Sequence, residues 1–235
     1  MNNLTTLLTQ SAATVGVELS PTQIDQFLQY KDLLLEWNEK INLTAITDEH
    51  EIMVKHFADS LSLTPYLEDS KNLIDVGTGA GFPGLPLKIA LPNLNVTLLD
   101  SLNKRLVFVN EVINTLGLTH VQTVHSRAED GARKNLREQF DYATARAVSR
   151  LSVLAEYCLP YVKVGGTFIA YKGADVKDEL AESASAIKIL GGEISEVKEI
   201  NFLGISHSLI MLKKYRQTSA QYPRTPAKIS QNPIK

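Results

Sequence analysis

The sequence predicts an α/β fold: a mostly parallel, seven-stranded sheet that ends in an antiparallel hairpin, preceded by a helical segment. Two observations favour this fold. From residue 72 onward, short apolar runs typical of strands alternate with helical patterns, and a crossover between parallel strands needs a helix that covers the sheet. After the fifth such run, two more strand-like runs lie close enough to pair as a hairpin.

Residues 1–65 are expected to form the helical segment, packed on the sheet domain. Ser20-Pro21-Thr22-Gln23 has the form of a capping box with proline at the first helical position. Apolar residues then recur at helical spacing from Ile24 to Leu35. After a break at residues 38–44, a second helix is expected to begin near Thr47 and to run to Pro65.

Residues 66–215 are expected to form the sheet domain. The predicted parallel strands are Asn72–Val76, Asn95–Leu99, His120–Val124, Phe140–Ala145 and Thr167–Tyr171. The predicted helices are Pro83–Ala90, Asn103–Leu116, Leu151–Val162 and Val176–Leu190, and the hairpin strands are Glu193–Ile200 and Ser208–Lys214. Residues 216–235 form a basic tail with three prolines and few apolar side chains, so we expect that it cannot fold alone.

Composition indicates a soluble cytoplasmic protein. The single cysteine, Cys158, cannot form an intrachain disulfide, and neither a membrane span nor a signal peptide is recognisable. The net charge of −2 argues against binding nucleic acid through bulk charge, although a local basic patch would still permit it. The histidines lack the spacing of a zinc site, so we expect no metal ion. We also expect a monomer.

The strongest local signal is a glycine-rich loop after the first predicted strand. That strand runs into Gly77-Thr78-Gly79-Ala80-Gly81-Phe82-Pro83-Gly84, and Asp100 follows the second strand. Glycines let the backbone approach a ligand closely, and N–H groups at a helix start can hold polar atoms. A carboxylate in the position of Asp100 can accept both hydroxyl hydrogens of a ribose. The loop therefore predicts a cofactor that contains a nucleoside.

Two cofactors are compatible with this loop. From Gly79 it matches the dinucleotide pattern, but the register from Gly77, which directly follows the strand, fails at Phe82. Pro83 also removes an N–H group that a pyrophosphate would need. Asp75, in the last part of the strand, would repel a pyrophosphate and attract the sulfonium and ammonium groups of S-adenosylmethionine. S-adenosylmethionine is therefore favoured over a nicotinamide cofactor.

From about Trp37 to Lys214 the chain closely resembles the bacterial 16S rRNA (guanine-N7)-methyltransferases, the RsmG or GidB family. The matching segments are Trp37-Asn38, Ile41–Ile46, His56–Leu61, Asp75–Pro86, Leu99–Ser101 with Lys104-Arg105, Ser126–Glu129, Phe140-Asp141, Ala145–Ala147 and Lys172-Gly173. The resemblance implies a Rossmann-like class I methyltransferase fold. It also implies transfer of a methyl group from S-adenosylmethionine to N7 of a guanine in the decoding-centre loop of 16S rRNA, in the small ribosomal subunit or its precursor.

The resemblance further implies site residues. Gly77, Phe82, Ala128, Glu129 and Arg146 match cofactor positions of the family. Arg146 is also expected to be catalytic, because it follows the fourth strand at the edge where open sheets bind ligands. An alternative for Glu129 is a solvated acid at a helix start, since Ser126 to Glu129 also form a capping box.

RNA contacts are expected at six positions, which are Asn38, His56, Arg127, Arg150, Lys172 and Arg224. Lys172, at the end of the fifth strand, is the better candidate for binding phosphate. Arg150 could equally neutralise a carboxylate, and a lone histidine such as His56 is more often structural than catalytic. The family often places residues between its Tyr-Pro-Arg motif and a following Thr-Pro motif, and this chain lacks them after Arg224.

Guanine N7 carries an available lone pair, so its methylation needs no general base. Direct transfer is consistent with a sequence that has no Cys–His or Ser–His–Asp arrangement, and the enzyme then contributes positioning and electrostatics. Three alternatives stay open at this point: a methyltransferase of a small molecule, a nicotinamide-dependent oxidoreductase, and a non-catalytic RNA-binding module.

Overall fold

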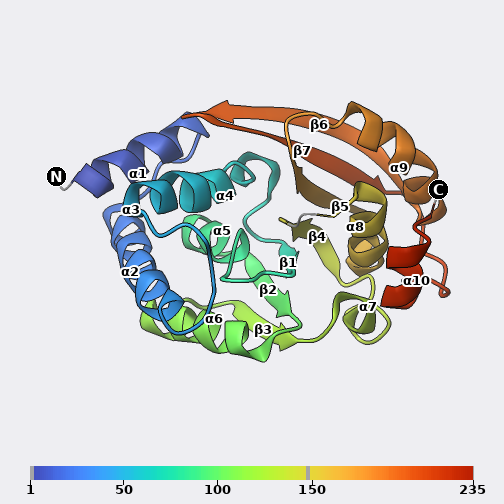
Figure 1. Ribbon diagram of the computed structural model, residues 1–235, viewed down its shortest axis with the longest axis horizontal. Helices are drawn as coiled ribbons and strands as arrows, with labels where there is room; N and C mark the ends of the chain where they lie inside the picture. The colour runs from blue at the N-terminus through green and yellow to red at the C-terminus, as the bar shows by residue number, and fades with distance from the viewer. Residues whose placement is uncertain (1–2, 147–148, 235) are drawn as a thin grey trace.

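A computed structural model describes residues 3–146 and 149–234. Its centre is a seven-stranded sheet with the strand order β3-β2-β1-β4-β5-β7-β6 (Figure 1). Strands β1 to β5 run parallel, and β7 runs antiparallel to both β5 and β6. The predicted fold class, with five parallel strands and a terminal hairpin, is confirmed. Ala147 of the family motif lies outside the described residues.

The strands are β1 Asn72–Val76, β2 Asn95–Asp100, β3 Val121–His125, β4 Phe140–Ala145, β5 Val162–Lys172, β6 Gly192–Phe202 and β7 Ile205–Lys214. The predicted start of β5 at Thr167 was wrong. Val162 pairs with Phe140 across a register shift in β4, so the strand begins five residues earlier and includes Gly165 and Gly166. Pairing between β4 and β5 therefore determines where β5 begins.

The helices of the sheet domain are α5 Gly84–Ala90, α6 Asn103–Thr115, α7 Ala128–Gly131, α8 Leu151–Cys158 and α9 Lys177–Ile189. The helix predicted to reach Val162 ends at Cys158, and the short 3-10 helix η3 Leu159–Tyr161 follows. The capping box predicted at Ser126 does not form, because α7 begins at Ala128 and the Ser126 hydroxyl donates to the carbonyl of Arg127.

The N-terminal segment consists of α1 Asn3–Thr14, α2 Pro21–Asn38, α3 Glu49–Glu51, the π-helix η1 Ile52–Ala58, α4 Asp59–Leu61 and the 3-10 helix η2 Thr64–Tyr66. The predicted capping box at Ser20 is present, with both of its hydrogen bonds. The second predicted helix is continuous through a π-helical stretch that apolar spacing did not reveal. Such stretches are rare and often occur at functional sites.

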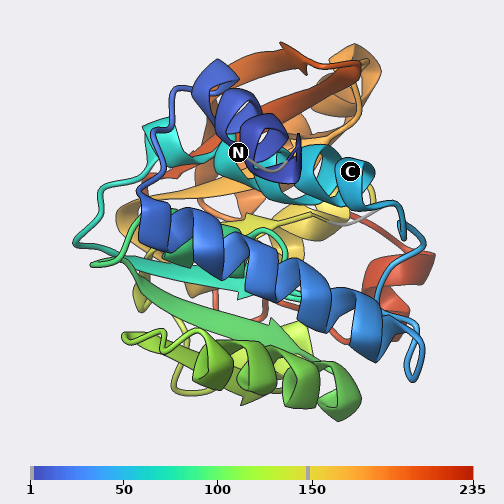
Figure 2. The same cartoon turned by 90° about the vertical axis from the view of Figure 1, so that its left-hand side faces the viewer.

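Two apolar clusters cover the two faces of the sheet. Successive residues of a strand point to opposite faces, so Leu98 packs in one cluster and Leu99 in the other. Helices α5 and α6 share the first face with the N-terminal segment, where α2 lies across them, and α8 and α9 cover the second (Figures 1 and 2). In the described residues, every helix is too short or too polar to span a bilayer.

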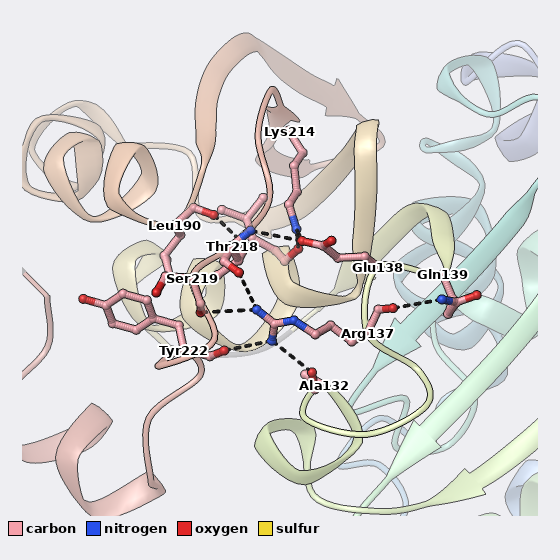
Figure 3. A network of polar contacts seen from close by, with 10 residues as sticks. Ala132, Arg137, Glu138, Gln139, Leu190, Lys214, Thr218, Ser219 and Tyr222 are labelled. Carbon is pink, nitrogen blue, oxygen red and sulfur yellow. Dashed lines mark hydrogen bonds and ion pairs between the residues drawn. The ribbon is translucent and has the colours of Figure 1, made fainter.

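The tail folds against the body and ends in the short helix α10 Pro226–Gln231, whose Ile229 is fully buried. The guanidinium of Arg137 and the carboxylate of Glu138 hold the tail from the loop before β4 (Figure 3). Glu138 Oε1 accepts from Lys214 Nζ at 2.8 Å and from the N–H of Thr218 at 3.0 Å. Arg137 donates to the carbonyls of Ala132, Thr218, Ser219 and Tyr222. The tail therefore folds through its contacts with the rest of the protein, although its composition would not let it fold alone.

Candidate functional site

The glycine loop curls over the carboxyl ends of β1 and β2. The N–H groups of Gly77 and Thr78 donate to the carbonyl of Leu99 at 2.8 and 3.0 Å. Gly77 and Gly79 have φ angles of +76° and +63°, which residues with a Cβ rarely adopt. A Cβ at either glycine would meet no atom closer than 4.0 Å, so the loop borders open space in which a ligand can lie.

Asp75 lies beneath this loop and is fully buried. Its Oδ2 accepts from the Thr78 hydroxyl at 2.6 Å and from the N–H of Gly84 at 3.0 Å. Its Oδ1 has no hydrogen-bond partner among the described residues. Burial raises the pKa of Asp75 to about 7, although the two hydrogen bonds favour the ionised form. Burial therefore disfavours the ionised form of Asp75, and a positively charged ligand near the loop would stabilise that form.

Asp100 ties the end of β2 to the glycine loop. Its Oδ2 accepts from the N–H of Gly79 at 2.9 Å, and its Oδ1 accepts from the N–H of Leu102 at 2.8 Å. Arg105 Nη1 lies 3.5 Å from Oδ2. Each carboxylate oxygen can accept more than one hydrogen bond, so these contacts leave room for a ligand hydroxyl.

The N-terminal segment encloses the aromatic ring of Phe82. The ring of Tyr30 stacks on it with centroids 5.5 Å apart, and the ring of His56 stacks at 4.5 Å. The Tyr30 hydroxyl donates to the carbonyl of Ala80, and a Cβ at Gly81 would lie 2.6 Å from that hydroxyl. Sequence reasoning missed Tyr30, which belongs to a helical apolar stripe and carries no motif of its own.

Arg146 connects the glycine loop with the N-terminal segment. Its guanidinium carbon lies 5.1 Å from the centroid of Phe82, within range of a cation–π contact. Its Nη1 donates to Asp59 Oδ2 at 3.1 Å, and its Nη2 lies 3.3 Å from His56 Nδ1. On the other side of Asp59, His207 Nε2 lies 2.9 Å from Oδ1. Asp59 and His207 were not expected in the site.

The protonation of His56 follows from these contacts. Burial, with the positive charge of Arg146 beside the ring, lowers the pKa of His56 to about 3. A guanidinium can only donate, so Nδ1 must accept and Nε2 must carry the hydrogen. Nε2 therefore donates to Thr44 Oγ1, 2.7 Å away. His56 is therefore neutral and largely buried against Arg146, so its ring offers little surface to an RNA.

A cavity of about 730 Å³ lies next to Arg146, at the carboxyl ends of β4 and β5. Its lining is mixed in character and includes Lys55, Asp59, Arg146, Ser149, Arg150, Tyr171, Lys172, Gly173, Glu179, Ile205 and His207. Arg146 is shared between the wall of this cavity and the contacts of the glycine loop. The cavity therefore lies next to the open side of the glycine loop, with Arg146 between them.

The other predicted RNA contacts have diverse surroundings. Arg127 and Arg150 are exposed, and Arg150 lies 3.9 Å from Glu182. Lys172 Nζ is held by Glu179 at 2.7 Å and by the carbonyl of Ser149. Asn38 Oδ1 accepts from the N–H groups of Leu43 and Thr44, which orders the loop that carries Thr44.

Arg224 points inward rather than to solvent. Its Nε and Nη2 donate to the carboxylate of Glu156, which is 1% exposed. The guanidinium is therefore committed to an internal ion pair. This placement does not fit the expected RNA contact, because the buried carboxylate holds two of the three guanidinium nitrogens.

Glu129 and Ala128 begin α7, beyond the carboxyl end of β3. Glu129 is 5% exposed, so the alternative of a solvated acid was wrong. The carbonyl of Ala128 accepts from the Tyr161 hydroxyl at 2.6 Å. The two residues lie on the same sheet edge as the glycine loop.

The strand order, the antiparallel β7 and the glycine loop after β1 define a class I S-adenosylmethionine-dependent methyltransferase fold. A solved structure described as a SAM-dependent methyltransferase from Aquifex aeolicus has a TM-score of 0.55 at 17% identity, covering 76% of this chain and 97% of that one. The profile of one family, GidB, described as rRNA small subunit methyltransferase G, matches residues 23–207. The chain belongs to this family, as its motifs predicted.

Close relatives span nearly the whole chain. A protein named ribosomal RNA small subunit methyltransferase G from Clostridium beijerinckii is 56% identical over 97% of this chain and 98% of its own length. A protein of the same name from Alkaliphilus metalliredigens is 54% identical with the same coverage.

Proposed function

We propose that this protein transfers a methyl group from S-adenosylmethionine to N7 of a guanine in 16S rRNA. The observation that carries the proposal is the position of Arg146, which contacts Phe82 of the glycine loop and also lines the adjoining cavity. Membership of the GidB family and the names of its relatives support the substrate class.

The glycine loop and its neighbours fit S-adenosylmethionine. Open space faces Gly77 and Gly79, and Asp75, when ionised, places a buried negative charge beneath them that favours a cationic ligand. Because Asp75 is fully buried, it acts through its field rather than by direct contact. Asp100 is suited to the ribose hydroxyls, and Ala128 with Glu129 to the edge of the adenine. When bound, this cofactor supplies the methyl group on a sulfonium.

In this proposal the acceptor guanine enters the cavity beside Arg146. N7 needs no deprotonation, so the protein has to orient the base and exclude water. The side chain of Arg146 is 21% exposed, and its guanidinium holds a positive charge at the boundary of the two spaces. Lys55 and Arg150 line the cavity and, being exposed, are placed to bind phosphates, with Arg127 farther along the edge. Lys172 lies in the same wall, but Glu179 and the carbonyl of Ser149 hold its Nζ, so it would bind a phosphate only after leaving them.

A methyl-transfer assay tests the proposal. Small ribosomal subunits that lack the modification are incubated with the protein and labelled S-adenosylmethionine, and the labelled base is mapped. Label at guanine N7 of 16S rRNA is expected. Label only on small molecules, or none on RNA, would contradict the proposal.

A pair of variants controls this assay. Gly77→Arg should abolish binding of S-adenosylmethionine in isothermal titration, because the side chain enters the open space at the loop. Gly16→Arg is the matched control. Gly16 has a φ of +80° and no atom within 4 Å of an added Cβ, so the backbone strain is comparable. Equal loss of binding in both variants would point to strain instead of the site.

A further inference from the structure

We propose that Asp59 is a positioning residue that fixes the guanidinium of Arg146 at the boundary between the glycine loop and the cavity. The inference rests on the proposed function, in which Arg146 acts on the bound reactants. Asp59 belongs to the segment His56–Leu61, which helped to identify the family but for which sequence reasoning gave this carboxylate no role.

The carboxylate of Asp59 lies between two basic side chains from distant parts of the chain. Arg146, after β4, donates to Oδ2 at 3.1 Å, and His207, on β7, lies 2.9 Å from Oδ1. The side chains of Asp59, Arg146 and His207 are 10%, 21% and 11% exposed. The ion pair between Asp59 and Arg146, shielded from water to this degree, interacts more strongly than a surface pair. His207 Nε2 forms no hydrogen bond among the described residues, so rotation of the carboxylate would lose the bond from Arg146.

The remaining contacts of Arg146 set its direction less firmly. The distances to His56 Nδ1 and to the carbonyl of Lys55 are 3.3 and 3.4 Å, which are long for hydrogen bonds. The contact with the face of Phe82 allows the guanidinium plane to rotate. The bond to Asp59 is the shortest of the three, at 3.1 Å, and it is charge-assisted, which makes such bonds roughly twice as strong as neutral ones. Asp59 is therefore the contact that orients the guanidinium.

The other carboxylate in the cavity wall is already engaged. Glu179 Oε1 lies 2.7 Å from Lys172 Nζ and accepts from the N–H of Leu151 at 2.6 Å. In the part of the chain that the structure describes, Asp59 is the carboxylate in ion-pair contact with Arg146. The wall of the cavity is thus completed only when the N-terminal segment docks on the sheet.

A double-mutant cycle on the full-length chain tests this role. Asp59→Asn keeps the size of the side chain and removes its charge, and it should lower kcat for methyl transfer to small subunits by about 10- to 100-fold, the cost of a misplaced catalytic group. In an Arg146→Ala background the same substitution should change kcat by less than about twofold, because the partner is gone. Asp59→Glu should recover part of the loss.

Two kinetic results would overturn the inference: wild-type kcat in Asp59→Asn, or an equal loss in both backgrounds, which a purely structural role would produce. If the wild-type protein methylates no RNA, the proposed function fails instead. A second measurement then still decides the role of Asp59. Nitrogen-15 NMR should show slowly rotating Nη groups for Arg146 in the wild type, identified by their absence in Arg146→Lys. Unchanged signals in Asp59→Asn would overturn the inference.

Discussion

The N-terminal segment and the C-terminal tail both lie outside the sheet, but they contact different parts of the protein. The N-terminal segment sends Tyr30, His56 and Asp59 into contact with the glycine loop and with Arg146. The tail packs on the other face of the sheet, beside α8, and turns Arg224 inward onto Glu156 (Figure 1). The first extension builds a wall of the site, whereas the second stabilises the body. A basic residue in an extension is therefore no sign of RNA binding until its partner is known.

The largest expected effect is on the tail. Arg224→Ala leaves the carboxylate of Glu156 buried without its cation, and losing one partner of a buried ion pair costs about 3–5 kcal/mol. Urea unfolding should show this loss in the free energy of unfolding, while the folded variant keeps wild-type methyl transfer. The exposed Lys228 provides the control, since Lys228→Ala should change stability by less than about 0.5 kcal/mol. If Arg224→Ala kept wild-type stability but bound RNA more weakly, the inference that the tail stabilises the body instead of binding RNA would be wrong.

A second prediction contrasts the two buried carboxylates, because Asp75 has no cation partner like that of Glu156. Its pKa of about 7 in the folded state, against a usual 3.8, means that the folded protein binds this proton more tightly. The protonated carboxyl of Asp75 therefore contributes to the free energy of unfolding. This contribution is complete below pH 4 and is lost as the pH rises to 7. Relative to Asp75→Asn, the wild type should lose about 1.4 kcal/mol of stability per pH unit over this range, roughly 4 kcal/mol in all.

Urea unfolding of both proteins at several pH values measures this difference. Titration calorimetry should also show that S-adenosylmethionine binds the wild type more tightly as the pH rises through 7, since a cation prefers the ionised carboxylate. Parallel pH profiles of stability in the wild type and Asp75→Asn would contradict the raised pKa of Asp75. The same pH dependence of S-adenosylmethionine binding in both proteins would contradict the assignment of Asp75 to the cofactor site.

The smallest expected effect concerns the contact between the N-terminal segment and the glycine loop. Tyr30→Phe removes one buried hydrogen bond to the carbonyl of Ala80, worth about 1 kcal/mol. If the loop loses its shape, the Kd for S-adenosylmethionine should rise about fivefold. Tyr222→Phe, in the tail, should leave this Kd unchanged. An equal rise in Kd for Tyr30→Phe and Tyr222→Phe would contradict the inference that only the N-terminal segment contributes to the site.

Much of the fold could be predicted because its signals are local. The bounds of β1 and β4 agree with prediction to the residue, since both are short apolar runs with polar or glycine-rich ends. The start of β5 could not be predicted, because it depends on pairing with Phe140. The π-helix that carries His56 could not be predicted either, because its seven residues are too few to reveal an i→i+5 period in the apolar spacing.

By itself, the sequence determined the glycine loop, its supporting acid Asp75 and the alternation of strands and helices, because these depend on residues close together in the chain. Only the tertiary structure decided that Asp59, Arg146 and His207 meet at one wall, and that Arg224 faces a buried carboxylate. Such meetings depend on the docking of whole elements. The identity of a side chain states what it can bind, whereas packing decides which partner it reaches.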